Sequence, residues 1–278
     1  MNDFKKAAVR IYNDAKREKR LTEGRTLEEI KRIALRHEGV IQTQVGSVAA
    51  DSEPMSRSAP HTRNSIDHPF GEPEERLARQ AMERLGKEKL VCLDTMVGDG
   101  RDGVTARFIM PEPYAQIAYG LKLLMDYPAA RVVEEPTYTI LFFTDEAFEP
   151  NKKKKLLDKD ITVRLWMGEK RGEQVKICRN TVYLGEAKKG VFMFEDWRVK
   201  AIDRTGLFLH AGARRDWLWI HDLETDRPEL TEVVTAISGL TATGKTTTLC
   251  RRLARLPRES SEMIGDDGGS LGFDGSYA

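Results

Sequence analysis

The sequence has few cysteines and no long apolar run, and each of these absences excludes a class of protein. The three cysteines, Cys92, Cys178 and Cys250, lie far apart and lack the paired spacing of metal ligands. We therefore expect buried free thiols in a reducing compartment, not a disulfide framework. No stretch is long enough to cross a membrane, and the charged amino terminus lacks the apolar core of a signal peptide. These features predict a cytoplasmic protein.

The sequence also has almost no net charge. Its 45 basic residues nearly balance its 44 acidic residues, which gives a formal net charge of +1. This balance predicts neither a nucleic acid nor a membrane as a partner, and nothing in the sequence indicates an oligomeric state. The hydrophobic share, 40% of 278 residues, is enough for one large or two medium domains with packed cores.

The most informative stretch is an apolar run, 233–237, that breaks into a glycine-bounded loop and closes in Gly-Lys-Thr. This is the pattern of a P-loop, in which backbone N–H groups surround a phosphate chain. Lys245 should reach the terminal phosphates, and the Thr246 hydroxyl should bind their magnesium ion. We expect the following helix to continue through Leu249, Leu253 and Leu256. The predicted nucleotide-binding residues are Gly239, Leu240, Thr241, Ala242, Thr243, Gly244, Lys245, Thr246 and Thr247.

A short apolar segment after the P-loop ends in Asp266 and Asp267. A strand with this ending is the expected partner of a nucleotide-bound metal, since one carboxylate can bind the cation and the other its water shell. The alternative is a solvated turn, because Gly265, Gly268 and Gly269 surround the pair.

Residues upstream of the loop add three candidates. Lys188 and Lys189 precede Gly190 and an apolar run, and His210 ends an apolar strand. An inward lysine next to other cations would be driven towards its neutral form, which can bind a metal. By itself His210 is better explained as a core histidine whose hydrogen bonds are satisfied. The lysine run 152–155 is interpreted as a solvated loop edge.

The hydrophobic pattern predicts an α/β protein with mixed strands and helices. We expect a peripheral helix or partly ordered arm over 1–20 and a short helix after Thr26, which begins a capping box with Glu29. The polar passage 51–75 is predicted to be a long loop. Further helices are predicted over 77–85 and 114–125 and in the segment through Trp197. Strands are predicted at 89–93, 105–109, 137–143, 161–167, 174–178, 207–211 and 217–220.

Together these residues resemble the ATP-dependent phosphoenolpyruvate carboxykinases. Four blocks carry the resemblance: 56–60 (Ser-Arg-Ser-Ala-Pro), 182–190 (Val-Tyr-Leu-Gly-Glu-Ala-Lys-Lys-Gly), 209–211 (Leu-His-Ala), and the P-loop with 264–267. The block 182–190 upstream of a P-loop, with a histidine between them, is specific. The sequence departs from the family pattern at Ser56, Ala59, Thr241 and Ala242.

The resemblance implies a carboxy-lyase of gluconeogenesis that decarboxylates oxaloacetate and phosphorylates the enolate with ATP, giving phosphoenolpyruvate, CO₂ and ADP. It implies that Arg57 and Tyr183 contact the substrate, with Lys188 close by, and that Lys189, His210 and Asp267 hold Mn²⁺. Thr246 would hold Mg²⁺, Lys245 the phosphates, and Asp266 the metal-bound water.

We expect a mixed α/β substrate-binding domain over 1–204 and a partial P-loop nucleotide-binding domain over 205–278. Family members continue past the point that matches Tyr277 and Ala278, so we interpret the sequence as the amino-terminal portion of such an enzyme. Two alternatives stay open. One is an inactive remnant that binds a dicarboxylate or nucleotide weakly, and the other is a different P-loop phosphotransferase. Only the first of these alternatives also explains the block 182–190.

Overall fold

The computed structural model describes residues 2–50, 59–98, 103–125, 133–145, 161–239 and 243–276. The chain forms two compact units, Met1–Phe194 (unit 1) and Glu195–Ala278 (unit 2). Helices and both parallel and antiparallel strand pairs confirm the mixed α/β class. The predicted domains, 1–204 and 205–278, stay a prediction.

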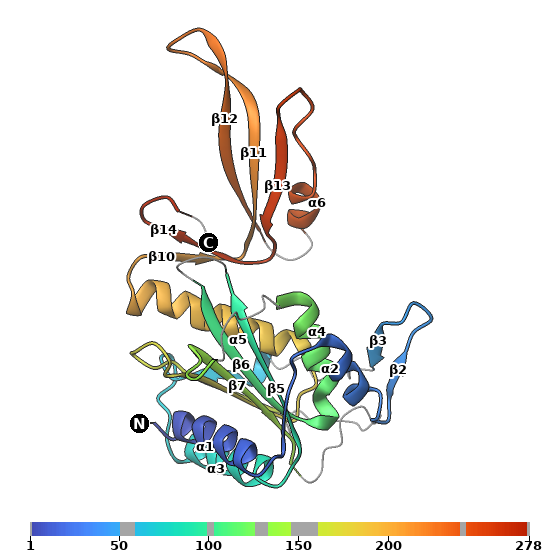
Figure 1. The fold of residues 1–278 in the computed structure, drawn as a ribbon. Coiled ribbons are helices and arrows are strands. Elements are labelled where there is room, and N and C mark those ends of the chain that lie inside the picture. Colours follow the sequence, from blue (N-terminus) through green and yellow to red (C-terminus); the bar gives the residue numbers. More distant parts are fainter. Residues whose placement is uncertain are drawn as a thin grey trace. The chain divides into compact units, whose positions relative to one another are not determined.

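A seven-stranded mixed sheet organises unit 1, with strand order β1-β5-β6-β7-β9-β8-β4. Its centre pairs β6 with β7 and β7 with β9 in parallel, while β5–β6 and β8–β9 are antiparallel. Every residue of β7 is buried because helices cover both faces of the sheet (Figure 1). The strands are β1 (Leu21–Glu23), β4 (Thr62–Asn64), β5 (Leu90–Val97), β6 (Val104–Pro111), β7 (Tyr138–Phe143), β8 (Thr162–Trp166) and β9 (Gln174–Arg179).

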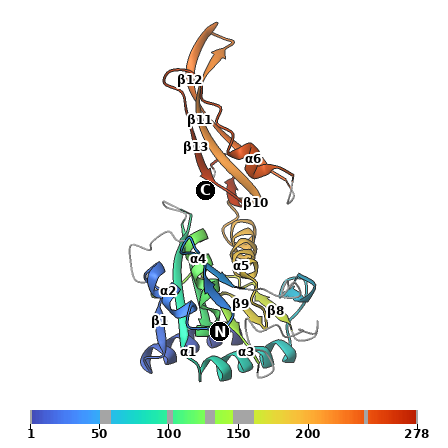
Figure 2. The same cartoon turned by 90° about the vertical axis from the view of Figure 1, so that its right-hand side faces the viewer.

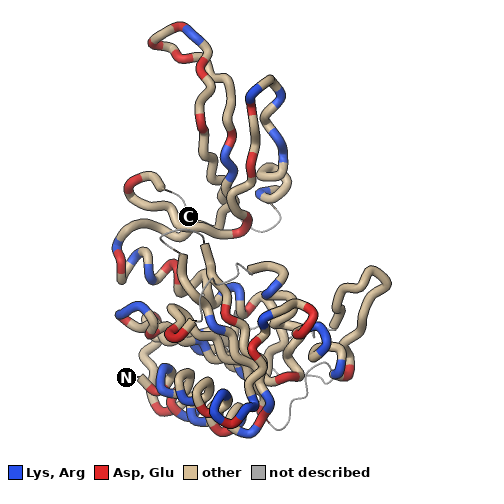
Figure 3. Tube along the Cα trace, in the orientation of Figure 1, with Lys and Arg blue, Asp and Glu red and all other residues tan. Residues whose placement is uncertain are grey.

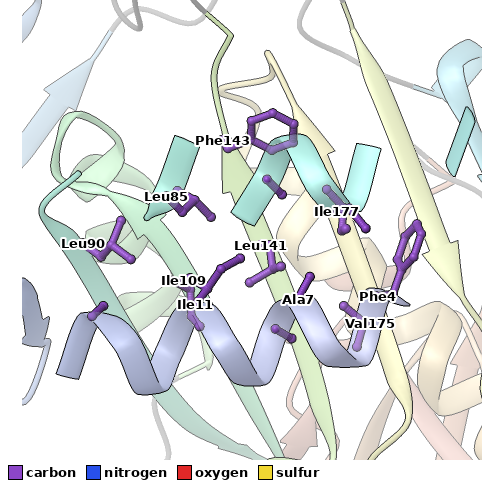
Figure 4. Packing of buried hydrophobic residues seen from close by; sticks show 14 of the residues in the cluster. Phe4, Ala7, Ile11, Leu85, Leu90, Ile109, Leu141, Phe143, Val175 and Ile177 are labelled. Atoms are coloured by element: carbon purple, nitrogen blue, oxygen red, sulfur yellow. The ribbon is translucent and has the colours of Figure 1, made fainter. Parts of the chain in front are cut away.

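Helices α1 (Asp3–Arg17) and α3 (Glu72–Leu85) cover one face of this sheet. Figure 4 shows the contact: Phe4, Ala7 and Ile11 of α1 lie against side chains of α3 and the central strands. Five residues of α1 are buried, so the amino-terminal segment is a wall of the main core, not the peripheral or partly ordered arm that was predicted. Its apolar residues recur at helical spacing, and this periodicity was the sign of burial.

The opposite face carries α4 (Ala115–Met125) and the first part of α5 (Leu184–Trp197). Tyr138 of β7 stacks against Phe194 at a ring-centroid distance of 5.4 Å. α4 and α5 approach closely, since a Cβ at Gly120 would lie 2.9 Å from Leu184 Cδ2. The block 182–190 is therefore attached to the central strands of unit 1.

Smaller elements surround the sheet. Thr26 begins α2 (Leu27–Ala34), as predicted, by accepting a hydrogen bond from the Glu29 N–H. The predicted loop over 51–75 is wrong in two places: β4 pairs in parallel with β8, and α3 begins at Glu72. Between them, residues 65–71 are turn and coil as predicted. Backbone pairing with β8 gives the polar residues of β4 their strand conformation. The remaining elements are β2 (Val40–Gln42), β3 (Val48–Ala50), η2 (Ala59–His61) and η4 (Glu112–Tyr114).

Unit 2 contains two small sheets. In the larger, β11 (Ala211–Asp222) lies between β12 (Arg227–Ser238) and β13 (Ser260–Gly265) and is antiparallel to both. Figure 2 shows these three strands side by side. The β11–β13 register shifts at Ala213/Arg214, where Ile264 is the extra residue of a β-bulge. The smaller sheet pairs β10 (Gly206–Leu209) with β14 (Gly269–Gly272), and the turn of π-helix η6 (Arg198–Ile202) precedes it.

Three further expectations for unit 2 and the cysteines are corrected. Helix α6 (Lys245–Leu249) ends at Leu249, and Leu253 and Leu256, which were predicted to extend it, are exposed. Cys250 is exposed, whereas Cys92 and Cys178 are buried as predicted. The predicted strand 207–211 is two strands, since β10 ends before His210 and β11 begins after it.

Basic and acidic residues are both distributed over the described chain, as Figure 3 shows. No helix in the described part of the chain is both long and apolar enough to span a membrane.

Candidate active site

The glycine-bounded loop lies between β12 and α6 in unit 2. Leu240, Thr241 and Ala242 lie outside the described residues. Gly239 faces Thr243 and the stem of Lys245, since a Cβ at Gly239 would lie 2.7 Å from Thr243 Oγ1 and 3.5 Å from Lys245 Cγ. Gly244 has φ +88°, which glycine adopts at little cost, and it begins α6. Lys245, Thr246 and Thr247 follow as the first residues of the helix.

Asp266 pairs with the start of this helix. The Thr246 hydroxyl donates a hydrogen bond to the Asp266 carboxylate, with distances of 3.1 and 3.3 Å to its two oxygens. Gly212 of β11 leaves room for this contact, because a Cβ there would lie 3.2 Å from Asp266 Oδ1. The end of β13 is therefore held next to the residue that was predicted to bind magnesium.

The second carboxylate of the pair contacts the predicted histidine. His210 Nε2 lies 2.8 Å from Asp267 Oδ1, and the two side chains are 48% and 34% exposed. The pairing of Leu209 with Gly269 brings the end of β10 to the start of β14 and so brings the two residues together. Asp267 has φ +78°, a left-handed conformation that aspartate tolerates better than most residues. Asp266 and Asp267, which are adjacent in the sequence, thus contact two different side chains, those of Thr246 and His210.

The block 182–190 forms the beginning of α5 in unit 1. The Tyr183 ring lies over Gly185, where a Cβ would be 2.5 Å from the ring carbon Cζ. Lys189 is exposed, and its Nζ lies 5.3 Å from the centroid of the Tyr183 ring. Lys188 Nζ lies 5.5 Å from the Phe192 ring. Tyr183 and Lys189 therefore form one cluster.

The sequence analysis missed a buried ion pair beneath this cluster. Lys176 of β9 is fully buried, and its Nζ donates to the Glu186 carbonyl at 2.6 Å and to Glu186 Oε2 at 2.8 Å. Gly190 provides the space, since a Cβ there would lie 2.8 Å from Lys176 Cδ. A lysine inside the apolar strand 174–178 was the available signal.

The structure brings the candidates together in two groups. His210, Asp267, Thr246, Asp266 and Lys245 belong to unit 2, whereas Tyr183, Lys188 and Lys189 belong to unit 1. Arg57 lies outside the described residues. Among the described residues there is no group of three or more His, Cys, Asp or Glu side chains that could hold a metal ion. A metal site here would have to draw on other donors, such as a lysine amine or a threonine hydroxyl.

The arrangement in unit 2 is typical of proteins that bind nucleotide phosphates: a glycine turn leads into a Lys-Thr helix, and Thr246 of this helix contacts the first of two aspartates that follow a strand. A profile of the phosphoenolpyruvate carboxykinase family, in its ATP-dependent form, matches residues 31–277. Because the match covers most of the sequence, the chain belongs to this family. No curated protein matches the sequence significantly.

Proposed function

We propose that this chain takes part in the ATP-dependent conversion of oxaloacetate to phosphoenolpyruvate, a cytoplasmic step of gluconeogenesis. The C–C bond to the departing carboxylate breaks, CO₂ leaves, and the electron pair forms the enolate of pyruvate. The enolate oxygen then attacks the γ-phosphorus of ATP, and ADP departs. Family membership supports this proposal. The observation that carries it is the double contact at the end of β13, Asp266 with Thr246 and Asp267 with His210.

The donors in unit 2 fit the divalent cations that the family implies. An imidazole nitrogen of His210 and a carboxylate oxygen of Asp267 already lie 2.8 Å apart, and both side chains are partly open to solvent. Mixed N/O donors of this kind suit Mn²⁺, with the Lys189 amine as the proposed third ligand. The Thr246 hydroxyl would hold Mg²⁺, and Asp266 would accept a hydrogen bond from a water in its shell. When bound, these cations neutralise negative charge on the enolate and the phosphoryl group.

The remaining candidates bind and orient the two substrates. Arg57 is proposed to hold a carboxylate of oxaloacetate through its two-pronged guanidinium, and the Tyr183 hydroxyl to donate a hydrogen bond to the same substrate. The Lys188 ammonium adds positive charge next to them. Lys245 is proposed to stabilise charge on the β- and γ-phosphates of ATP, and we propose that residues 239–247 bind the phosphate chain through their N–H groups.

A matched pair of histidine variants tests the proposal. His221 also makes a 2.8 Å contact with an aspartate, Asp226, but it lies near the tip of the β11–β12 hairpin. Purified chain is incubated with ATP, Mg²⁺, Mn²⁺ and oxaloacetate, and phosphoenolpyruvate is measured. We expect product from the wild type and from His221→Asn, and at least about a tenfold loss in His210→Asn and Lys189→Ala.

Other outcomes overturn the proposal. Equal output from the wild type and Lys189→Ala would mean that the predicted cluster does no chemistry. Binding of oxaloacetate without product would support the inactive remnant. Consumption of ATP that does not depend on oxaloacetate would support a different phosphotransferase.

A further inference from the structure

A buried arginine that no sequence motif identifies bonds to the carboxyl end of helix α6. Arg214 lies on β11, is 6% exposed, and donates from Nη1 to the carbonyl oxygens of Thr248, Leu249 and Arg251 at 3.1, 3.4 and 2.7 Å. These carbonyls lie at and just after the carboxyl end of α6. The last carbonyls of a helix have no partner within the helix, and a cation is favoured at that end.

A second buried residue orients this arginine. Arg214 Nε donates to Asp216 Oδ2 at 2.7 Å, and Asp216 is 1% exposed. The two residues are two positions apart on one strand, so their side chains are on the same face of the sheet. The carboxylate therefore fixes the direction in which the guanidinium points.

Helix α6 is short. It has five residues, and backbone bonds at its ends run from the Thr248 N–H to the Gly244 carbonyl and from the Cys250 N–H to the Thr246 carbonyl. Leu249 is the one buried residue of the helix. So short a helix is not stable by itself, because nucleation costs more than a few bonds return. Its conformation depends on the strand to which it is attached.

We infer that Arg214 is a positioning residue for the nucleotide: it holds α6 against β11 and thereby fixes the Lys245 ammonium and the Thr246 hydroxyl. This inference rests on the proposed function, in which these two groups bind the phosphates and their cation. Without Arg214, α6 samples other conformations, and the apparent affinity for ATP falls in proportion to the fraction of chains that keep the binding conformation.

The neighbouring residue supplies a matched control. Arg215 is on the same strand but on the other face, is 44% exposed, and pairs with Glu232 at 2.9 Å and Glu262 at 3.8 Å. Arg215→Met removes the same chemical group from β11 without touching α6. Arg214→Lys keeps a cation but has a single nitrogen with which to reach the carbonyls.

The experiment measures Kd for ATP in the presence of Mg²⁺ by calorimetry, and hydrogen exchange at the Thr248 and Cys250 amides. We expect Kd to rise at least about tenfold in Arg214→Met and by less in Arg214→Lys, and to change less than about twofold in Arg215→Met. Exchange at the two amides should accelerate in Arg214→Met alone. If Arg214→Met does not fold, the double variant Arg214→Met/Asp216→Leu replaces the buried pair with apolar side chains and is measured instead.

Three results separate the two proposals. An unchanged Kd in Arg214→Met, or an equal rise in Arg215→Met, overturns the role of Arg214. If the wild type binds no ATP, the proposal that unit 2 binds a nucleotide is overturned. Hydrogen exchange at the Thr248 and Cys250 amides then still decides whether Arg214 holds α6. Unchanged exchange in Arg214→Met overturns that role as well.

Discussion

Removing the buried lysine of unit 1 should destabilise the fold more than its single charge suggests. Lys176→Met keeps the apolar stem of the side chain but deletes the ammonium that contacts the Glu186 carboxylate at 2.8 Å. Lys176 and Glu186 are 0% and 2% exposed, so water does not replace the lost cation. Breaking a buried ion pair by removing one partner costs about 3–5 kcal/mol. A typical domain is stable by roughly 5–15 kcal/mol, so this change removes a large share of the total.

The assay must report on unit 1 alone. Trp166 packs next to Phe70, with ring centroids 6.2 Å apart, and the other tryptophans, Trp197, Trp217 and Trp219, belong to unit 2. A background that keeps Trp166 and replaces the others with Phe therefore follows denaturant unfolding of unit 1 by fluorescence. As a control, Arg76→Met breaks an exposed pair with Glu72, and we expect a loss of at most about 1 kcal/mol.

A double-mutant cycle tests the physical reason. Replacing both charges, in Lys176→Met/Glu186→Leu, should bring stability back to within about 1–2 kcal/mol of the wild type, because an apolar pair avoids the cost of burying charge. The coupling between the two positions should therefore exceed about 1 kcal/mol. If the double variant loses the sum of the two single losses, the two charges are independent and the reasoning is refuted.

Two further predictions follow from burial. In the native chain Cys250 should react with a thiol reagent long before the other cysteines, because desolvation raises the pKa of Cys178 to about 12 and that of Cys92 well above its usual value. Rapid reaction of a second cysteine would contradict this prediction. Desolvation also raises the pKa of the Glu88 carboxyl group, although the positive charge of Arg84 acts in the opposite direction. The folded state therefore binds the Glu88 proton more tightly than the unfolded state does. The stabilisation that comes from this proton disappears as the pH rises through the raised pKa. Glu88→Gln should therefore raise Tm at about pH 7 and leave it unchanged at about pH 3, where Glu88 is protonated in both states, and an equal shift at both pH values would argue against the burial effect.

Local patterns in the sequence predict much of the fold. The apolar spacing in 77–85 and 114–125 predicted helices, and the apolar segments around Ile109, Ile140 and Ile177 predicted strands of the main sheet. These elements bury one face or are buried on both, so their composition reflects their position. Strand β4 has no such pattern, because its neighbour β8 is far along the chain and the pairing uses backbone groups.

The parts of the candidate site that depend on the order of motifs along the sequence were predictable. The order of P-loop and aspartate pair predicted that the pair would serve a metal bound next to the P-loop, and in the structure Asp266 accepts a hydrogen bond from Thr246. The metal itself stays a prediction. The contact between His210 and Asp267 agrees with their predicted role as ligands of one metal, which stays a prediction. Lys176 and Arg214 were missed because a lysine or arginine in a strand is usually exposed. The apolar neighbours of Lys176 were a signal of its burial, whereas only three-dimensional packing identifies Arg214 as buried.

Because of the β-bulge at Ile264, the number of residues in β13 matters more for the candidate site than the exposed side chains of this strand do. Beyond the bulge come Asp266 and Asp267, which are adjacent in sequence yet face Thr246 and His210 respectively. Substitutions at the exposed Met263 or Ile264 do not change which groups the two aspartates face. Loss or gain of one residue would shift the strand by one step, so at most one of the two carboxylates would still face Thr246 or His210. The number of residues in β13 is therefore more constrained than the identity of its exposed side chains at Met263 and Ile264.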